Sequence, residues 1–144
     1  MPDAPRLDRQ VCFALYSASR AATAVYRPLL EELGLTYPQY LVMLVLWENE
    51  PRGVRELGEE LGLDSGTLSP LLKRLEALAL VDRRRSAEDE RRVAVHLTDA
   101  GRALSSKASG VPQQLAAAAG LTPSELDQLR ETLGKLTAAL HGSL

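Results

Sequence analysis

The sequence contains very little cysteine and few aromatic residues. Of its 144 residues, one is cysteine, one is phenylalanine, one is tryptophan and four are tyrosine. A single cysteine excludes an intrachain disulfide, so nothing in the sequence suggests a secreted, cross-linked scaffold. The two histidines, His96 and His141, lie in unrelated contexts, and we expect neither a metal site nor another cofactor.

The sequence also lacks a long hydrophobic run. The longest run, YLVMLVLW at residues 40–47, is much shorter than the roughly 20 residues of a membrane-spanning helix. The N-terminus has no basic region followed by an apolar run, so we expect no signal peptide. The length and the 45% share of hydrophobic residues are ordinary for one domain with its own core. We therefore expect a protein of the reducing cytoplasm that has no membrane partner.

Charge is unevenly distributed along the chain. The net charge is −2, but residues 65–92 hold seven basic and five acidic side chains, which leaves +2 there and −4 elsewhere. A basic segment between acidic flanks is compatible with a polyanionic partner, because the distribution of charge matters more than the total.

Four helices are predicted in the first half of the chain. Apolar residues at helical spacing predict a long helix over residues 7–33, which Pro28 should kink or divide and Gly34 should end. A capping-box pattern formed by Thr36 and Gln39 predicts a second helix, up to about residue 48. Two further helices are predicted at residues 54–61 and 65–78, with a buried leucine stripe at residues 68, 71, 72, 75 and 78. The short turn GLD between them is typical of a helix-turn-helix.

The spacing of apolar residues changes after residue 78 from a helical to a strand-like pattern. Residues 80–85 and 92–98 read as two strands around the polar tip SAEDER, which predicts a hairpin. Thr98 should cap a helix that runs to about residue 119 and weakens near residues 109–112. Thr122, Pro123 and Glu125 are typical of the start of a last helix. Its leucines at positions 126, 129, 133, 136 and 140 form a two-heptad seam suited to a partner helix.

The predicted fold class is mainly α with a small β-hairpin, in a single domain over residues 1–144. A winged helix-turn-helix DNA-binding domain occupies residues 36–98, with the recognition helix at about 65–78 and the wing at about 80–98. Residues 7–33 and 111–144 form a helical dimerisation region, because two recognition helices must reach half-sites about one DNA turn apart. The alternative is that the terminal leucines only pack on the chain's own core.

Candidate DNA-reading residues follow from this arrangement. The start of a recognition helix lies nearest the base edges, so its small and hydroxyl residues should read bases or bind phosphates. Two basic residues one turn later should contact phosphates or guanine. Arg91 at the hairpin tip should enter the minor groove, Asp89 should brace a nearby arginine, and the arginines of the first strand should contact the DNA backbone. The alternative for each arginine is a solvated surface charge. The candidates are Ser65, Thr67, Ser69, Pro70, Lys73, Arg74, Arg83, Arg85, Asp89 and Arg91.

Three stretches carry a family resemblance: CFALYSASRA, LTYPQYLVMLVLWE and LDSGTLSPLLKRLEALALVDRRRSAEDERRVAVHLTDAG. They resemble the MarR family of winged-helix repressors and, within it, the OhrR-type regulators that sense organic hydroperoxides. The resemblance runs from about residue 7 to residue 104. It implies a transcriptional repressor, not an enzyme, that binds a pseudo-palindromic double-stranded DNA operator as a homodimer.

The resemblance also assigns a role to Cys12. The residues alone suggest a small buried hydrophobe in an apolar helix, whereas the resemblance implies a peroxide-reactive thiol. It further implies that Tyr26 and Tyr37 bond the reactive sulfur from the partner subunit, and Tyr16 lies one turn from Cys12 on the same helix face. Tyr40 is interpreted as an interface aromatic with a solvent-exposed hydroxyl.

The expected chemistry starts with oxidation of Cys12 to a sulfenic acid. Because there is no second cysteine, a low-molecular-weight thiol should cap the sulfenic acid, as in the one-cysteine type of the branch. Excess peroxide would instead drive Cys12 irreversibly to a sulfinic or sulfonic acid. After either product the repressor should release its operator and derepress peroxide-resistance genes. Two alternatives stay open: a repressor released by a small aromatic or phenolic ligand without thiol chemistry, and a thiol peroxidase, which the missing second thiol disfavours.

Overall fold

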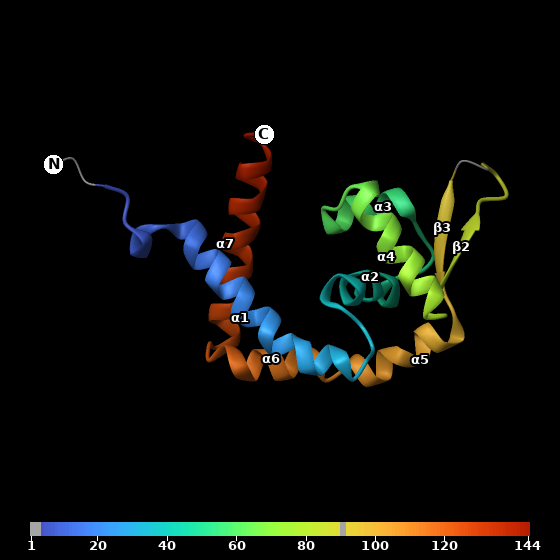
Figure 1. Ribbon diagram of the computed structural model, residues 1–144, viewed down its shortest axis with the longest axis horizontal. Helices are drawn as coiled ribbons and strands as arrows, with labels where there is room; N and C mark the ends of the chain where they lie inside the picture. The colour runs from blue at the N-terminus through green and yellow to red at the C-terminus, as the bar shows by residue number, and fades with distance from the viewer. Residues whose placement is uncertain (1–3, 90–91) are drawn as a thin grey trace. The chain divides into compact units, whose positions relative to one another are not determined.

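The computed structural model describes residues 4–89 and 92–144, and it is mainly helical with one small sheet, as predicted (Figure 1). The chain forms two compact units, Met1–Ser109 and Gly110–Leu144. No described helix is long and apolar enough to cross a membrane. In chain order the elements are η1 (Leu7–Arg9), α1 (Val11–Glu31), α2 (Tyr37–Glu48), β1 (Arg52–Gly53), α3 (Val54–Leu61), α4 (Ser65–Ala77), β2 (Val81–Arg85), β3 (Val93–Leu97), α5 (Asp99–Ala108), α6 (Val111–Ala119) and α7 (Pro123–His141).

The first long helix starts later than predicted. A short 3₁₀ turn covers Leu7–Arg9, and α1 begins only at Val11. Pro28 lies inside α1 without dividing it, since a proline removes one hydrogen bond of the helical ladder and the flanking bonds persist. Gly34, with φ +71°, turns the chain out of the helix as predicted.

Helix α2 is the centre of the first unit. Its predicted capping box is confirmed: the backbone N–H of Gln39 donates to Thr36 Oγ1, and the backbone N–H of Thr36 donates to Gln39 Oε1 at 3.0 Å. The helix is apolar on all sides, which is typical of a helix that other elements surround. Its buried residues are Gln39, Tyr40, Val42, Met43, Val45 and Leu46.

The predicted helix-turn-helix is confirmed in α3 and α4. Gly62, with φ +68°, ends α3, and Asp64 caps α4. Leu68, Leu72 and Leu75 are at most 1% exposed. The predicted buried stripe was wrong at Leu78, which is 48% exposed because it follows the last helical residue, where the chain turns away.

The hairpin carries a third strand that the sequence did not predict. Strands β2 and β3 pair antiparallel from Val81 opposite Leu97 to Arg85 opposite Val93, as the hairpin prediction requires. The two-residue strand β1 pairs with the other edge of β3, with Arg52 opposite Val95, so the sheet order is β1-β3-β2. Two residues are too few to show an alternating pattern, which is why β1 escaped prediction.

The second unit consists of α6 and α7. The predicted weak point near residues 109–112 is a break, since α5 ends at Ala108 and α6 begins at Val111. Thr122 and Glu125 form the predicted capping box of α7. No residue of α7 is buried, and Leu129 and Leu140 are 45% and 50% exposed. The other seam leucines, Leu126, Leu133 and Leu136, are half-buried, so none of the five is fully buried.

Candidate DNA interface and redox site

The predicted reading residues of α4 share one accessible face. The buried leucines occupy the opposite face, which packs into the first unit. The backbone N–H of Thr67 donates to Asp64 Oδ1 at 2.8 Å, and the hydrogen bonds from Thr67 lower the pKa of Asp64. This cap fixes the start of the helix that would meet base edges. Exposed on α4 are Ser65, Gly66, Thr67, Pro70, Lys73 and Arg74, and Ser69 is half-buried.

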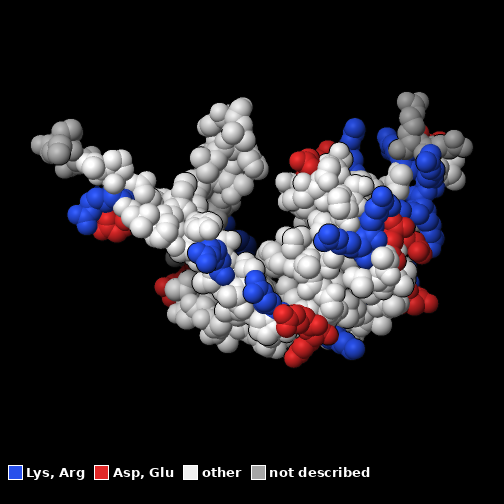
Figure 2. Space-filling model, viewed as in Figure 1, with Lys and Arg blue, Asp and Glu red and all other residues white. Residues whose placement is uncertain are grey.

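Basic side chains gather over α4 and the β2–β3 hairpin (Figure 2). Arg84 lies 3.6 Å from the carboxylate of Asp82, and both side chains are more than half exposed. Arg92 lies 3.7 Å from the carboxylate of Asp89, so Asp89 is paired with a nearby arginine, as the predicted bracing role requires. Arg85 is exposed on β2, whereas Arg91 lies outside the described residues.

Arg83 has a partner that the sequence did not reveal. Its Nε donates to the carboxylate of Glu76 in the last turn of α4, and about a third of each side chain is exposed. The ion pair joins the recognition helix to the first strand of the wing. No local pattern in the sequence signals this ion pair, because one residue lies in a helix and the other in a strand, with a turn between them.

Helix α5 is clamped to the junction between α4 and β2. The Thr98 hydroxyl donates to the carbonyl of Ala79 at 2.7 Å, and the Thr98 N–H donates to the carbonyl of Leu80 at 3.0 Å. A Cβ at Gly101 would lie 2.2 Å from the carbonyl oxygen of Leu80, so only glycine fits there. On the other side, Trp47 Nε1 donates to the carbonyl of Gly101 at 2.9 Å.

Cys12 is exposed, so the interpretation as a buried hydrophobe was wrong. It is the second residue of α1, whose start has no side-chain cap, and a helix start favours negative charge. Tyr16, one turn further along the helix, is 59% exposed. The guanidinium of Arg20 lies 5.5 Å from the centroid of the Tyr16 ring.

The remaining tyrosines form a cluster near the C-terminal end of α1. The ring centroid of Tyr26 is 5.0 Å from that of Tyr37 and 6.1 Å from that of Tyr40. Burial, with smaller contributions from the two neighbouring tyrosines, raises the pKa of Tyr26 to about 12. Tyr26 therefore keeps its proton and can donate a hydrogen bond at neutral pH.

Tyr40 belongs to the core rather than to a wet interface. It is 2% exposed, and burial raises the pKa of its hydroxyl. The interpretation as an interface aromatic was wrong, because elements on all sides of α2 cover the residue. Tyr26 and Tyr37 are only half-buried, so part of each ring stays accessible.

One chain does not bring Cys12 to its tyrosine cluster. Fourteen residues of α1 separate Cys12 from Tyr26, which corresponds to about 21 Å along the helix axis. The structure therefore brings Tyr26 and Tyr37 together but leaves Cys12 with Tyr16 at the far end of the same helix. Among the described residues there is also no cluster of side chains that could hold a metal ion.

Comparison with known proteins decides the family. Residues 24–108 match the family described as transcriptional regulator SarA/Rot. The organic hydroperoxide resistance transcriptional regulator of Bacillus subtilis is 46% identical over 139 residues, which span 96% of this chain and 95% of that relative. The chain belongs to the MarR family of winged-helix transcriptional regulators. Within this family it falls in the OhrR-type branch, and it is of the one-cysteine type.

Solved structures of MarR-type regulators agree with this placement. Reduced and overoxidized AbfR, a protein of Staphylococcus epidermidis, have both been solved bound to DNA, and each is 36% identical to this chain with a TM-score of 0.76. The match with overoxidized AbfR covers 94% of this chain and 95% of the AbfR chain. PcaV of Streptomyces coelicolor, solved with its natural ligand, is 25% identical with a TM-score of 0.80, over 96% of this chain and 99% of that one. The MarR-family match thus extends beyond the residues 7–104 expected from motifs, and the protein is a DNA-binding transcriptional regulator.

Proposed function

We propose that this protein is a homodimeric repressor that releases its operator when an organic hydroperoxide oxidises Cys12. The observation that carries the proposal is the separation of about 21 Å along α1 between the exposed Cys12 thiol and the tyrosine cluster around Tyr26. A second chain can bridge this separation, whereas the chain itself cannot.

The apolar surface left open in one chain supports a dimer. Leu30 is the one buried residue of α1, and α7 has none. Val11, Phe13 and Tyr16 are between 41% and 65% exposed. Covering such side chains contributes about 1.5–3 kcal/mol for each large one that becomes fully buried. A second copy supplies equally apolar surfaces, which makes self-association the natural way to cover them.

The proposed arrangement also completes the redox site. When two copies of α1 lie antiparallel and cross near Ser19, Cys12 lies level with Tyr26 of the partner subunit, because both are seven residues from the crossing. Tyr26 and Tyr37 would then donate hydrogen bonds to the sulfur anion across the interface, while Tyr16 supports it from the same chain. Such bonds stabilise a thiolate.

The chemistry needs only a peroxide and a thiol. The Cys12 thiolate attacks the terminal oxygen of the hydroperoxide, so that an S–O bond forms and the O–O bond breaks. The alkoxide takes up a proton and leaves as the alcohol, and the sulfenic acid remains. A low-molecular-weight thiol then condenses with it, which forms a mixed disulfide and releases water. Exposed Val11 and Phe13 beside the thiol favour peroxides with an apolar tail.

Operator binding is assigned to α4 and the wing. The hydroxyls of Ser65, Thr67 and Ser69 and the ring of Pro70 would face base edges, while Lys73 and Arg74 would bind phosphates. Arg85 and Arg91 would contact the DNA from the wing. Arg83 and Asp89 would act indirectly, because each is engaged with a neighbour of opposite charge.

The test compares the native protein with Cys12→Ser in an operator gel shift. Both should bind with similar affinity, and cumene hydroperoxide with a small thiol should release only the native protein. Intact mass then shows which product causes release. This distinction matters because overoxidized AbfR has been solved on DNA, so we expect release to follow the mixed disulfide rather than the sulfonate. Release of the serine variant by peroxide would refute the sensing role of Cys12.

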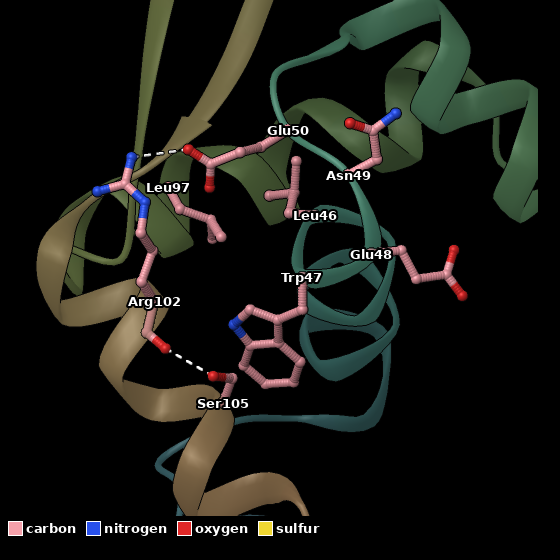
Figure 3. A pocket seen from close by; sticks show the side chains of 8 residues that line it. All are labelled: Leu46, Trp47, Glu48, Asn49, Glu50, Leu97, Arg102 and Ser105. Atoms are coloured by element: carbon pink, nitrogen blue, oxygen red, sulfur yellow. Dashed lines mark hydrogen bonds and ion pairs between the residues drawn. The ribbon is translucent and has the colours of Figure 1, made fainter.

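The alternative of a ligand-released repressor has one observation in its favour. A groove of about 490 Å³ lies between the end of α2 and α5 (Figure 3), a volume typical of small-molecule sites. However, its cation, Arg102, already pairs with Glu50 at 2.7 Å and with Asp99 at 3.0 Å. An aromatic carboxylate would therefore have to displace existing ion pairs, which disfavours this function. Operator release by salicylate from the serine variant would favour it.

A further inference from the structure

We infer that Trp47 is the positioning residue that links the tyrosine cluster to the reading elements. The inference rests on the proposed function, because it explains how a change at the redox site reaches DNA. It is carried by an unbroken row of contacts within the first unit, from the end of α1 to the base of the wing.

The row begins with aromatic rings. From Tyr26 it passes to Tyr40, whose ring centroid is 6.1 Å away, and from Tyr40 to Trp47, 6.3 Å away in an edge-to-face arrangement. Both distances lie within the range in which aromatic rings interact directly. Tyr40 is almost fully buried, so a shift of Tyr26 has little free space in which to be absorbed.

The row continues through one directional bond. Figure 3 shows the indole of Trp47 facing α5, where Nε1 donates to the carbonyl of Gly101 at 2.9 Å. Gly101 has no side chain, and its backbone rests against the backbone of Leu80, where a Cβ would already overlap. A displacement of the indole therefore moves the backbone of Gly101 against the backbone of Leu80, with no flexible side chain between them to absorb the movement.

Through Leu80 this displacement reaches the recognition helix α4 and the wing strand β2. Leu80 lies between the end of α4 at Ala77 and the start of β2 at Val81. Thr98 fixes the same junction through its bonds to Ala79 and Leu80. A shift of α5 thus changes the recognition helix and the wing together.

A second connection between the same elements is weaker. Arg102 of α5 pairs with Glu50 after α2, but its side chain is 53% exposed. Exposed ion pairs contribute little and are screened by salt. The hydrogen bond of the half-buried indole is directional and less accessible to water, so we assign the coupling to Trp47.

The decisive variant is Trp47→Phe, which keeps an aromatic ring but removes the N–H donor. The reduced variant should bind operator nearly as well as the native protein, and Cys12 should be oxidised at the native rate by intact mass. The factor by which oxidation weakens operator binding should fall about fivefold for each oxidised subunit, as expected for one net hydrogen bond per subunit. Ser105→Ala is the matched control: its hydroxyl donates to the carbonyl of Arg102 within α5, and its loss should leave that factor unchanged.

The result separates this inference from the proposed function. If oxidation weakens operator binding of Trp47→Phe by the same factor as in the native protein, Trp47 does not transmit the signal, although Cys12 remains the sensor. If the native protein keeps its operator after oxidation, or the Cys12→Ser variant loses it, the sensing proposal itself fails.

A second measurement needs no change at position 47. Trp47 is the sole tryptophan of the sequence, so the intrinsic fluorescence of the protein reports on this indole. Peroxide with a small thiol should shift its emission in the native protein and leave Cys12→Ser unchanged. Unchanged emission in a native protein that has released its operator would overturn the inference, even if the phenylalanine variant does not fold.

Discussion

Arg83 of β2 donates its Nε to the carboxylate of Glu76 in α4. Helix and wing contact DNA in different grooves in the proposed complex, so their mutual orientation decides whether both fit at once. The pair is partly shielded from water and holds this orientation from inside the protein. Arg83 therefore differs from Lys73, which is exposed on α4, in what its removal should change.

Substitution of Lys73 and of Arg83 should distinguish a residue that binds a DNA phosphate from one that forms an ion pair within the protein. Lys73→Gln should weaken operator binding and reduce the slope of log affinity against log salt concentration by about 1.8, because the proposed homodimer loses one phosphate contact on each subunit and each contributes about 0.9. Arg83→Gln should leave the slope unchanged and lower the free energy of unfolding by about 1 kcal/mol. Fluorescence anisotropy at several salt concentrations and urea unfolding provide the measurements. Lys107→Gln, at an exposed position in the last turn of α5, is the control. A reduced slope for Arg83→Gln would identify a direct phosphate contact.

Gly101 should not tolerate even the smallest side chain. The Cβ of Gly101→Ala would lie 2.2 Å from the Leu80 carbonyl oxygen, and overpacking of this kind costs about 1–3 kcal/mol. Gly134→Ala in α7 meets nothing within 4 Å and should stabilise the protein by about 0.5–1 kcal/mol, because alanine favours helix. Urea unfolding of both variants checks the contrast. An equally stable Gly101→Ala protein would mean that α5 can move away from Leu80 at little cost.

The raised pKa of Tyr26 predicts a loss of stability in alkali. Its pKa is about 12 in the folded chain against an ordinary value of 10.0. The unfolded chain therefore loses this proton first as pH rises, and the free energy of unfolding should fall between about pH 10 and pH 12. Tyr26→Phe should reduce this fall in the free energy of unfolding. Phenolate absorbance should also show that a component titrating near pH 12 disappears with Tyr26, and its persistence would contradict the assignment.

The leucine seam of α7 should be required for self-association. Leu129 is 45% exposed in one chain, and Leu129→Arg would place a charge in the proposed interface, where burial is costly. Sedimentation should then show monomers, and operator affinity should drop steeply because a single recognition helix makes half of the contacts. Gln128→Arg adds the same charge one residue outside the seam and should leave the dimer intact. A dimeric Leu129→Arg protein would place the interface elsewhere.

Local signals account for the parts of the fold that the sequence predicted. Thr36 and Thr122 each find their capping partner three residues away, so the pattern and the contact occupy the same few residues. The β2–β3 hairpin likewise pairs neighbouring segments. The strand β1 depends on pairing with β3 about forty residues later, and its two residues carry no pattern of their own.

The candidate site was less predictable because it depends on distant contacts. The bonds from Arg83 to Glu76 and from Trp47 to Gly101 join different elements, and neither follows from periodicity. The burial of Tyr40 depends on what surrounds α2, not on its own neighbours in sequence. The role of Cys12 follows from family resemblance, since its single-chain surroundings show an accessible thiol at a helix start and no more.

The distance between Cys12 and its own tyrosine cluster has a consequence for dimers that combine two different variants. In the proposed dimer each redox site takes its sulfur from one chain and its phenols from the other. A chain with Cys12→Ser and a chain with Tyr26→Phe and Tyr37→Phe would each be insensitive alone. A mixed dimer of the two chains has one whole site beside one doubly defective site, so the purified mixed dimer should release operator on oxidation although neither homodimer does.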